Sequence, residues 1–175
     1  IEWSRLEPAE GEWDETAIEH YRDYIHELKQ RGIEPVINLW HWTNPLWFEA
    51  KGGFKHRRNL KYFDRFIAKV AQEYGKELKW VLTINEPNNY TIFGYLFQDT
   101  SSGSAWPPGE HSYVAATRVY LNLIAAHKRA YRILKAHHPH LQIGVAASLA
   151  NIQAKHSTEI IDKVATKLMR LAWDW

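Results

Sequence analysis

The stretch WVLTINEPNNY, residues 80–90, combines a strand of buried type with a polar end. Its first five residues are apolar or β-branched, a composition typical of strands. Asn85 and Glu86 follow, and Pro87 then stops the strand, because a proline has no backbone N–H for the sheet ladder. The residue before a proline is biased toward extended geometry. We therefore expect Glu86 to lie in extended conformation at the end of the strand, beside Asn85.

Further strands are predicted on both sides of this one. IEPVINLWHW, residues 33–42, precedes it and is interpreted as a buried strand. LQIGVAAS, residues 141–148, follows it. IEWSRLEP, residues 1–8, is interpreted as the end of an earlier strand. Residues 87–109 are dense in turn formers and are predicted to form a long loop.

Helices alternate with these strands, because apolar residues recur at helical spacing. The helices are predicted at residues 14–31, 59–75, 112–135 and 157–175. Asp14 and Asn59 are the expected N-caps of the first two helices, and Gly32 ends the first. In the last helix, the residues expected to face inward are Ile160, Ile161, Val164, Leu168 and Leu171.

Alternating strands and helices predict an α/β fold with a parallel sheet. The long connections follow the strands, as in a (β/α)₈ barrel, where the chemistry lies at the carboxyl ends of the strands. A closed barrel needs eight strands and typically about 250 residues. The chain supplies three complete strands and part of another, so residues 1–175 are expected to form a single domain that covers about half of a barrel.

Composition narrows the classes of function. The chain has 175 residues, of which 45% are apolar, and a net charge of +2, so no strong attraction to nucleic acid or to an anionic membrane is expected. No apolar run is long enough to span a bilayer. The absence of cysteine excludes thiolate metal sites and fits a reducing compartment, and we expect a cytoplasmic protein. The AHHPH run (residues 136–140) matches no zinc spacing and is interpreted as surface, so neither a metal nor a cofactor is predicted.

Polar and aromatic residues gather at the predicted strand ends. Arg5 ends the first strand, His41 and Trp42 end the next, and Asn85 and Glu86 end the third. A sugar pocket needs donors and acceptors for hydroxyl groups, an aromatic surface for the ring face and an acid for the leaving oxygen. Partial burial near a second carboxylate raises the pKa of a carboxyl group, which suits a general acid. Glu7 is interpreted as a loop or ion-pair residue and not as a second catalytic carboxylate.

The chain resembles glycoside hydrolase family 1, the β-glucosidase and β-galactosidase family. The resemblance rests on EWSRLEP, HWTNP, TINEP and WPPG, which occur in the order of the family, and it extends over essentially the whole chain. It implies a (β/α)₈ barrel and a retaining β-glycosidase. The expected substrates are small-molecule β-glycosides or oligosaccharides.

The resemblance also implies roles for individual residues. Glu86 would be the general acid/base, and Asn85 would hold the sugar 2-hydroxyl. His41 would reach a neighbouring hydroxyl, and Trp42 would shape the sugar subsite. Arg5 would lie against the catalytic nucleophile and keep it ionised, as a nearby cation does.

Part of the family pattern is missing from this sequence. The family nucleophile is a glutamate in a Thr-Glu-Asn-Gly motif, and no Glu-Asn pair occurs here. The chain matches strands two to five of the family barrel. Ser148 stands where the family often has Asn, and Phe54 where it has Trp. We therefore expect a glycosidase as the parent protein and an inactive 175-residue chain.

Two other interpretations stay open at this level. The chain could be a non-catalytic half-barrel that associates with a complementary fragment or with itself, since an open parallel sheet exposes edges and one face. It could also be a weak sugar-binding module that keeps the Trp and His contacts without turnover.

Overall fold

The computed structural model describes residues 1–96, 106–148, 151–156 and 158–173. Three parallel strands form one sheet in the order β1 (Val36–Asn38), β2 (Trp80–Asn85) and β3 (Gln142–Ala146). The register places Val36 beside Trp80, and Trp80 beside Gln142. The three predicted strands are confirmed, although β1 is much shorter than the predicted residues 33–42.

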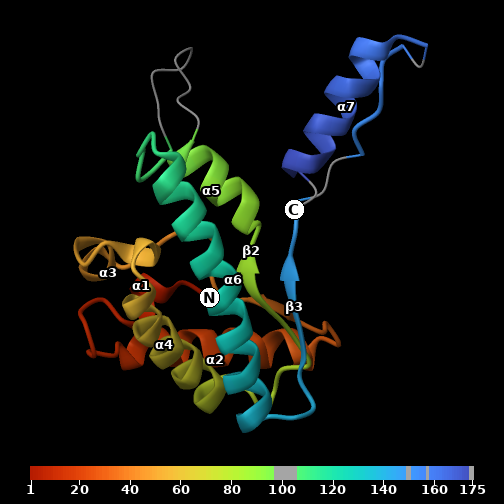
Figure 1. Cartoon of the computed structure of the whole chain (residues 1–175). Coiled ribbons are helices and arrows are strands. Elements are labelled where there is room, and N and C mark those ends of the chain that lie inside the picture. The colour runs from red at the N-terminus through yellow and green to blue at the C-terminus, as the bar shows by residue number, and fades with distance from the viewer. Residues whose placement is uncertain (97–105, 149–150, 157, 174–175) are drawn as a thin grey trace.

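Three long helices run between and beside the strands (Figure 1). They are α2 (Glu15–Gln30), α4 (Leu60–Tyr74) and α6 (Tyr113–His137). The shorter elements are α1 (Trp3–Leu6), α3 (Leu46–Ala50), η1 (Gly53–Lys55), η2 (Arg57–Asn59), α5 (Pro87–Tyr95) and α7 (Ile160–Trp173). No helix among the described residues is long and apolar enough to cross a membrane.

The helix ends follow the predicted capping only in part. Asp14 accepts a hydrogen bond from the Ala17 N–H at 3.0 Å, as an N-cap should, and Gly32 has a φ of +72° just beyond α2. Asn59 occupies the predicted N-cap position of α4, but its side chain accepts no capping hydrogen bond. Its side-chain amide donates instead to the carbonyl oxygens of Lys51 and Gly53, both at 2.9 Å, and so fastens the preceding loop to the start of the helix.

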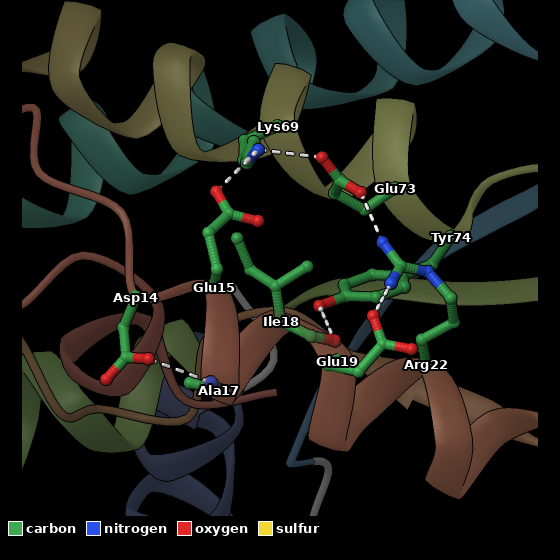
Figure 2. A network of polar contacts seen from close by, with 9 residues as sticks. All are labelled: Asp14, Glu15, Ala17, Ile18, Glu19, Arg22, Lys69, Glu73 and Tyr74. Atoms are coloured by element: carbon green, nitrogen blue, oxygen red, sulfur yellow. Dashed lines mark hydrogen bonds and ion pairs between the residues drawn. The ribbon is translucent and has the colours of Figure 1, made fainter.

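Helices α2 and α4 are joined by a network of polar contacts (Figure 2). The Tyr74 hydroxyl donates to the carbonyl oxygen of Ile18 at 3.0 Å. Glu73 accepts from Arg22 at 2.6 Å and from Lys69 at 2.7 Å. Because one carboxylate binds cations from both helices, the network fixes the position of α2 against α4.

The two faces of the sheet differ in exposure. Ile37, Leu39 and Val81 point to the helix side and are buried. Val36 and Trp80, which share the opposite face by register, are 59% and 42% exposed. The core therefore lies between the sheet and the helices, and the other face of the sheet is open to solvent.

The interpretation of residues 1–8 as a strand end is wrong. Trp3–Leu6 form the short helix α1, in which the N–H groups of Arg5 and Leu6 bond to the Glu2 carbonyl oxygen at 3.2 and 3.3 Å. These local hydrogen bonds satisfy the backbone without a neighbouring strand. The chain still reaches the sheet, because the amino group of Ile1 donates to the Asn38 carbonyl oxygen at 2.9 Å.

The predicted loop over residues 87–109 is also partly wrong. Pro87–Tyr95 form helix α5, with the proline in its first turn. A proline is well tolerated there, because the first N–H groups of a helix have no partner within the helix. Residues 97–105 of the predicted loop lie outside the described residues.

Helix α7 confirms the predicted periodicity but not the predicted burial. Ile160 and Ile161 are 77% and 80% exposed, and Val164 and Leu168 are also exposed. Leu171 lies outside the described side chains. Figure 1 shows α7 standing away from α4 and α6. An apolar stripe predicts a helix, but its burial depends on a surface to pack against, which the described elements do not place beside α7.

Candidate active site

The carboxyl ends of β1 and β2 bring four of the predicted site residues to one edge of the sheet. Backbone hydrogen bonds to β2 continue past the end of β1, from the Leu39 N–H to the Leu82 carbonyl at 2.8 Å and from the Asn85 N–H to the Trp40 carbonyl at 2.9 Å. His41 and Trp42 therefore lie directly beside Asn85, and Glu86 is the next residue.

Asn85 is held from both sides by the preceding strand end. Its side-chain amide lies 3.1 Å from Nε2 of His41, and its carbonyl oxygen accepts a hydrogen bond of 2.8 Å from the Trp42 indole N–H. The His41 and Trp42 rings meet edge to face, with centroids 5.2 Å apart. These contacts fix the imidazole, the indole and the amide as one unit, as predicted from their positions after neighbouring strands.

Two residues at this edge have left-handed backbone conformations. Among the described residues, Trp42 (φ +73°) and Glu86 (φ +40°) are the two non-glycine residues with positive φ. The predicted extended geometry of Glu86 is therefore wrong: φ +40° and ψ +63° turn the chain from β2 directly into α5. Such conformations are strained for residues with a side chain, and strain of this kind is concentrated at functional sites.

The Glu86 carboxylate has a partner that the sequence analysis missed. The side-chain amide of Asn89 donates to Oε2 of Glu86 at 3.1 Å. Glu86 occupies the N-cap position of α5 and Asn89 lies three residues later, the spacing at which N-cap and helix residues contact one another. Identifying α5 as a helix would have revealed this contact.

Arg5 is not joined to the other four residues. Its guanidinium lies 5.9 Å from the centre of the Tyr21 ring, and its side chain is exposed. Within the described part of the chain it makes no hydrogen bond or ion pair with His41, Trp42, Asn85 or Glu86. Arg5 lies apart from these residues because it projects from helix α1 and not from the end of a strand.

A groove of about 550 Å³ adjoins His41 and Trp42. Loops and helices that follow β1 and β2 line it, and they contribute Asn44, Leu46, Glu49, Tyr90, Trp106 and Pro108 among others. Asn44 donates a hydrogen bond to the Glu49 carboxylate. Burial raises the pKa of Glu49 above its ordinary value, and the nearby Glu110 carboxylate contributes in the same direction. The sequence analysis did not identify this groove.

Other clusters of polar residues lie away from this edge. His138 and His140 contact the carbonyl oxygens of Ala71 and Leu78 at 3.0 and 3.1 Å, as expected of surface histidines that fasten a loop. Among the described residues, one group has metal-ligand spacing, formed by His156, Glu159 and Asp162 near the start of α7. Its residues are largely exposed.

Glu7 forms the predicted ion pair. Its side chain is fully buried and accepts hydrogen bonds from Arg65, from the Trp3 indole at 2.8 Å and from the Gly11 N–H at 2.8 Å. These three hydrogen bonds hold the Glu7 carboxylate inside the protein. Glu7 is therefore a structural residue, as the sequence indicated.

Comparison with known proteins decides the family. The model of glycosyl hydrolase family 1 matches residues 1–175. The chain belongs to glycosyl hydrolase family 1. Beta-glucosidase 3 of Arabidopsis thaliana is 34% identical over 170 residues, which cover 93% of this chain and 34% of that protein. A beta-galactosidase of Saccharolobus solfataricus is 32% identical over 134 residues, covering 70% of this chain and 27% of that protein.

Solved structures of family 1 enzymes have the same fold over the whole chain. The beta-glycosidase from Pyrococcus horikoshii superposes with a TM-score of 0.88 at 38% identity and covers 100% of this chain. A beta-glucosidase from Thermotoga maritima in complex with deoxynojirimycin gives 0.88 at 25% identity and 99% coverage. The predicted membership of the (β/α)₈ barrel class is confirmed. The chain spans about a third of the length of these relatives, 39% of the first structure and 38% of the second.

Proposed function

We propose that this chain is the part of a retaining β-glycosidase that corresponds to strands two to five of the family barrel, and that the complete enzyme hydrolyses terminal β-linked sugars. Glu86 is the general acid/base in this proposal. The observation that carries it is that His41, Trp42, Asn85 and Glu86 lie together at the carboxyl edge of the sheet in a chain of family 1. The backbone is strained at two of these residues, Trp42 and Glu86. The substrates are small-molecule β-glycosides or oligosaccharides.

Glu86 would act twice in each catalytic cycle. In the first step its carboxylic acid proton passes to the glycosidic oxygen, while the bond between that oxygen and the anomeric carbon breaks and the nucleophile carboxylate bonds to that carbon. In the second step the Glu86 carboxylate takes a proton from the attacking water and regains its acid form. The Asn85 amide, which contacts His41, would bond the sugar hydroxyl next to the anomeric carbon.

The nucleophile of this proposal lies outside the chain. A retaining mechanism needs a second carboxylate about 5–5.5 Å from the acid/base. The Thr-Glu-Asn-Gly motif expected to supply it does not occur in the 175 residues. In a complete barrel Arg5 would lie near this nucleophile and keep it ionised. The 175-residue chain alone is therefore expected to be inactive.

A segment exchange tests the role of Glu86. In the Pyrococcus horikoshii beta-glycosidase, the segment that aligns with this chain is replaced by residues 1–175. We expect the chimera to hydrolyse aryl β-glucosides and Glu86→Gln to lower its kcat/KM by about 10²–10⁴-fold, the usual contribution of general acid–base catalysis. The loss should be smaller for a dinitrophenyl glucoside than for an alkyl glucoside, because dinitrophenolate departs without a proton.

The control is Glu34→Gln, the same substitution at an exposed carboxylate before β1, which should leave kcat/KM unchanged. A folded chimera whose Glu86→Gln variant is as active as its parent would exclude Glu86 as the acid/base. Hydrolysis by the mass-verified 175-residue chain alone, lost in Glu86→Gln, would contradict the expected inactivity of this chain.

The exposed sheet face favours a second proposal, that the 175-residue chain associates with a complementary barrel fragment or with itself. Val36 and Trp80 on the sheet and Ile160 and Ile161 on α7 are apolar and solvent-exposed. Exposed apolar patches of this kind usually form contacts between proteins. Sedimentation of the purified chain tests self-association, and a monomer at all concentrations would exclude it.

A further inference from the structure

The groove beside His41 and Trp42 combines aromatic walls with a carboxylate. Trp42, Tyr90 and Trp106 contribute rings, and Leu46 and Pro108 extend the apolar lining. The Trp42 and Trp106 rings lie with their centroids 5.1 Å apart. The lining is therefore mostly carbon, and Glu49 is its one carboxylate among the described residues.

The Glu49 carboxylate is held in place before any ligand arrives. The Asn44 amide nitrogen donates to its Oε1, and the Asn44 side-chain oxygen accepts from the Trp40 indole at 2.7 Å. Because Asn44 is fixed at both ends, Glu49 cannot turn away easily. Within residues 1–96 and 106–148, no other side chain donates to the Glu49 carboxylate, so one of its oxygens is left for a further donor.

The charges around Glu49 sum to a negative value. Lys55 lies close enough to stabilise the ionised form of Glu49, and Glu110 close enough to oppose it. Lys55 and Glu110 form an ion pair with each other. Since these two charges offset one another, the charge of Glu49 is left without a full partner. The raised pKa of Glu49 agrees with this geometry, because its causes are burial and the second carboxylate.

We propose that this groove binds a protonated amine carried on an apolar ring. The ammonium group would donate to the available Glu49 oxygen, and the ring would lie against Trp42 and Trp106. A cation is attracted both by a carboxylate and by the faces of aromatic rings, most strongly by tryptophan. A neutral hydroxyl group would gain only the hydrogen bond, and an anion would be repelled. Charge and lining thus favour the same ligand class.

This site is distinct from the proposed acid/base. Glu86 does not line the groove, whereas His41 and Trp42 border both. Binding of an amine can therefore be measured without turnover, and it does not depend on the role of Glu86. In a complete barrel an amine in the groove would lie next to any sugar held by His41.

A matched pair of ligands tests the proposal. Benzylamine and benzyl alcohol have nearly the same shape, and only benzylamine is protonated at pH 8, where histidine side chains with an ordinary pKa are neutral. The 175-residue chain is titrated with each ligand at low salt, and the indole N–H signals of Trp42 and Trp106 are followed by NMR. We expect benzylamine to bind at least about tenfold more tightly, as for a hydrogen-bonded charge pair that is partly desolvated.

Two substitutions test whether the charge of Glu49 causes the preference for benzylamine. Glu49→Gln keeps the shape of the side chain and can still accept from Asn44, so benzyl alcohol should bind as before while the preference for benzylamine falls to less than about threefold. Glu34→Gln removes an exposed carboxylate at the opposite end of β1 and should keep the full preference. Circular dichroism verifies that each variant is folded.

Three results would overturn the proposal. They are equal affinities in the unmodified chain, a preference for benzylamine that survives in Glu49→Gln, and binding that leaves the Trp106 indole signal unmoved. None of them concerns the role of Glu86, because Glu86→Gln should keep the preference for benzylamine whether or not Glu86 is the acid/base.

Discussion

Asn89 donates a hydrogen bond of 3.1 Å from its side-chain amide to Oε2 of Glu86. The other end of the same amide, Oδ1, is buried and has no hydrogen-bond partner among the described residues. A general acid/base alternates between a carboxylate, which accepts hydrogen bonds, and a carboxylic acid, which also donates one. An asparagine amide can serve both forms, because rotation about its last bond exchanges the NH₂ group for the oxygen.

Asn89→Leu is expected to lower kcat of the chimera by about tenfold, the effect of losing a hydrogen bond to a charged group. The substitution removes the hydrogen bond that orients the Glu86 carboxyl group, and a leucine side chain cannot replace it. KM should change little, because Asn89 contacts Glu86 and not the proposed sugar ligands.

Asn88→Leu is the matched control. Asn88 is the neighbouring amide and is also buried, but it donates to the Ser148 carbonyl oxygen at 2.9 Å. The loss of this hydrogen bond should reduce stability and leave kcat of the folded chimera unchanged. If Asn89→Leu kept the kcat of the parent, as Asn88→Leu should, Asn89 would have no part in positioning the Glu86 carboxyl group.

Backbone strain at Glu86 predicts a gain in stability when the side chain is removed. A residue with a Cβ costs roughly 1 kcal/mol in the left-handed region, whereas glycine enters it freely. Glu86, at φ +40°, should therefore give a Glu86→Gly variant about 1 kcal/mol more stable than Glu86→Gln, although both lack the acid. Urea unfolding of the two variants measures the difference.

The same pair of substitutions at Glu34 should give the opposite order. Glu34 has no positive φ, so glycine there only increases the freedom of the unfolded chain and destabilises by about 0.4–1 kcal/mol. If Glu86→Gly were less stable than Glu86→Gln, the left-handed conformation would carry no strain.

The elements that could be predicted from sequence are those in which local signals agree. Helix α2 has its cap at Asp14, and β2 is a continuous apolar run that ends before Pro87. The convergence of His41 and Asn85 followed from parallel strands alone, because their carboxyl ends share an edge. No tertiary contact was needed for these predictions.

The predictions failed where the conformation depends on long-range contacts or on an uncommon local geometry. The pre-proline rule predicted extended geometry at Glu86, but the direct turn from β2 into α5 requires a left-handed residue. Arg5 was misplaced because local hydrogen bonds form α1. The groove could not be predicted, since residues 41–49, Tyr90 and Trp106 come from segments that meet only in the fold.

The ion pair between the buried Glu7 carboxylate and the partly exposed Arg65 predicts a loss of stability when Arg65 is replaced. Glu7 is fully buried, so Arg65→Met would leave a carboxylate without its cation while keeping an apolar stem against the Trp47 and Tyr62 rings. Removing one partner of a fully buried pair costs about 3–5 kcal/mol. Arg65 is 36% exposed and Glu7 keeps its hydrogen bonds from Trp3 and Gly11, so thermal and urea unfolding should show a smaller loss, of about 1–3 kcal/mol.

Lys51→Met provides the comparison at the surface. Lys51 pairs with Glu10 at 2.9 Å, and both side chains are solvent-exposed. Exposed pairs contribute little to stability, so no measurable change in the unfolding midpoint is expected. Equal effects of Arg65→Met and Lys51→Met would show that the burial of Glu7 does not determine the contribution of its ion pair.

His127 predicts a loss of stability in mild acid. Its Nδ1 lies 2.7 Å from the Thr83 hydroxyl, which itself donates to the Gly144 carbonyl oxygen at 3.2 Å, so Nδ1 is the donor of this hydrogen bond. Burial, with a smaller contribution from Lys128, lowers the pKa of His127 below its ordinary value. The folded state then binds the proton less readily than the unfolded state.

The contribution of His127 is therefore complete above pH 6.5, and it is lost as the pH falls from there through the pKa of the folded state. His127→Gln cannot titrate and can still bond to Thr83, so its stability should fall less between pH 7.5 and 5.5 than that of the unmodified chain. His20→Gln, on the exposed face of α2, should keep the parent's pH dependence. Urea unfolding at the two pH values measures the stability of all three proteins. If the stability of His127→Gln fell as much as that of the unmodified chain, the acid sensitivity would belong to other groups.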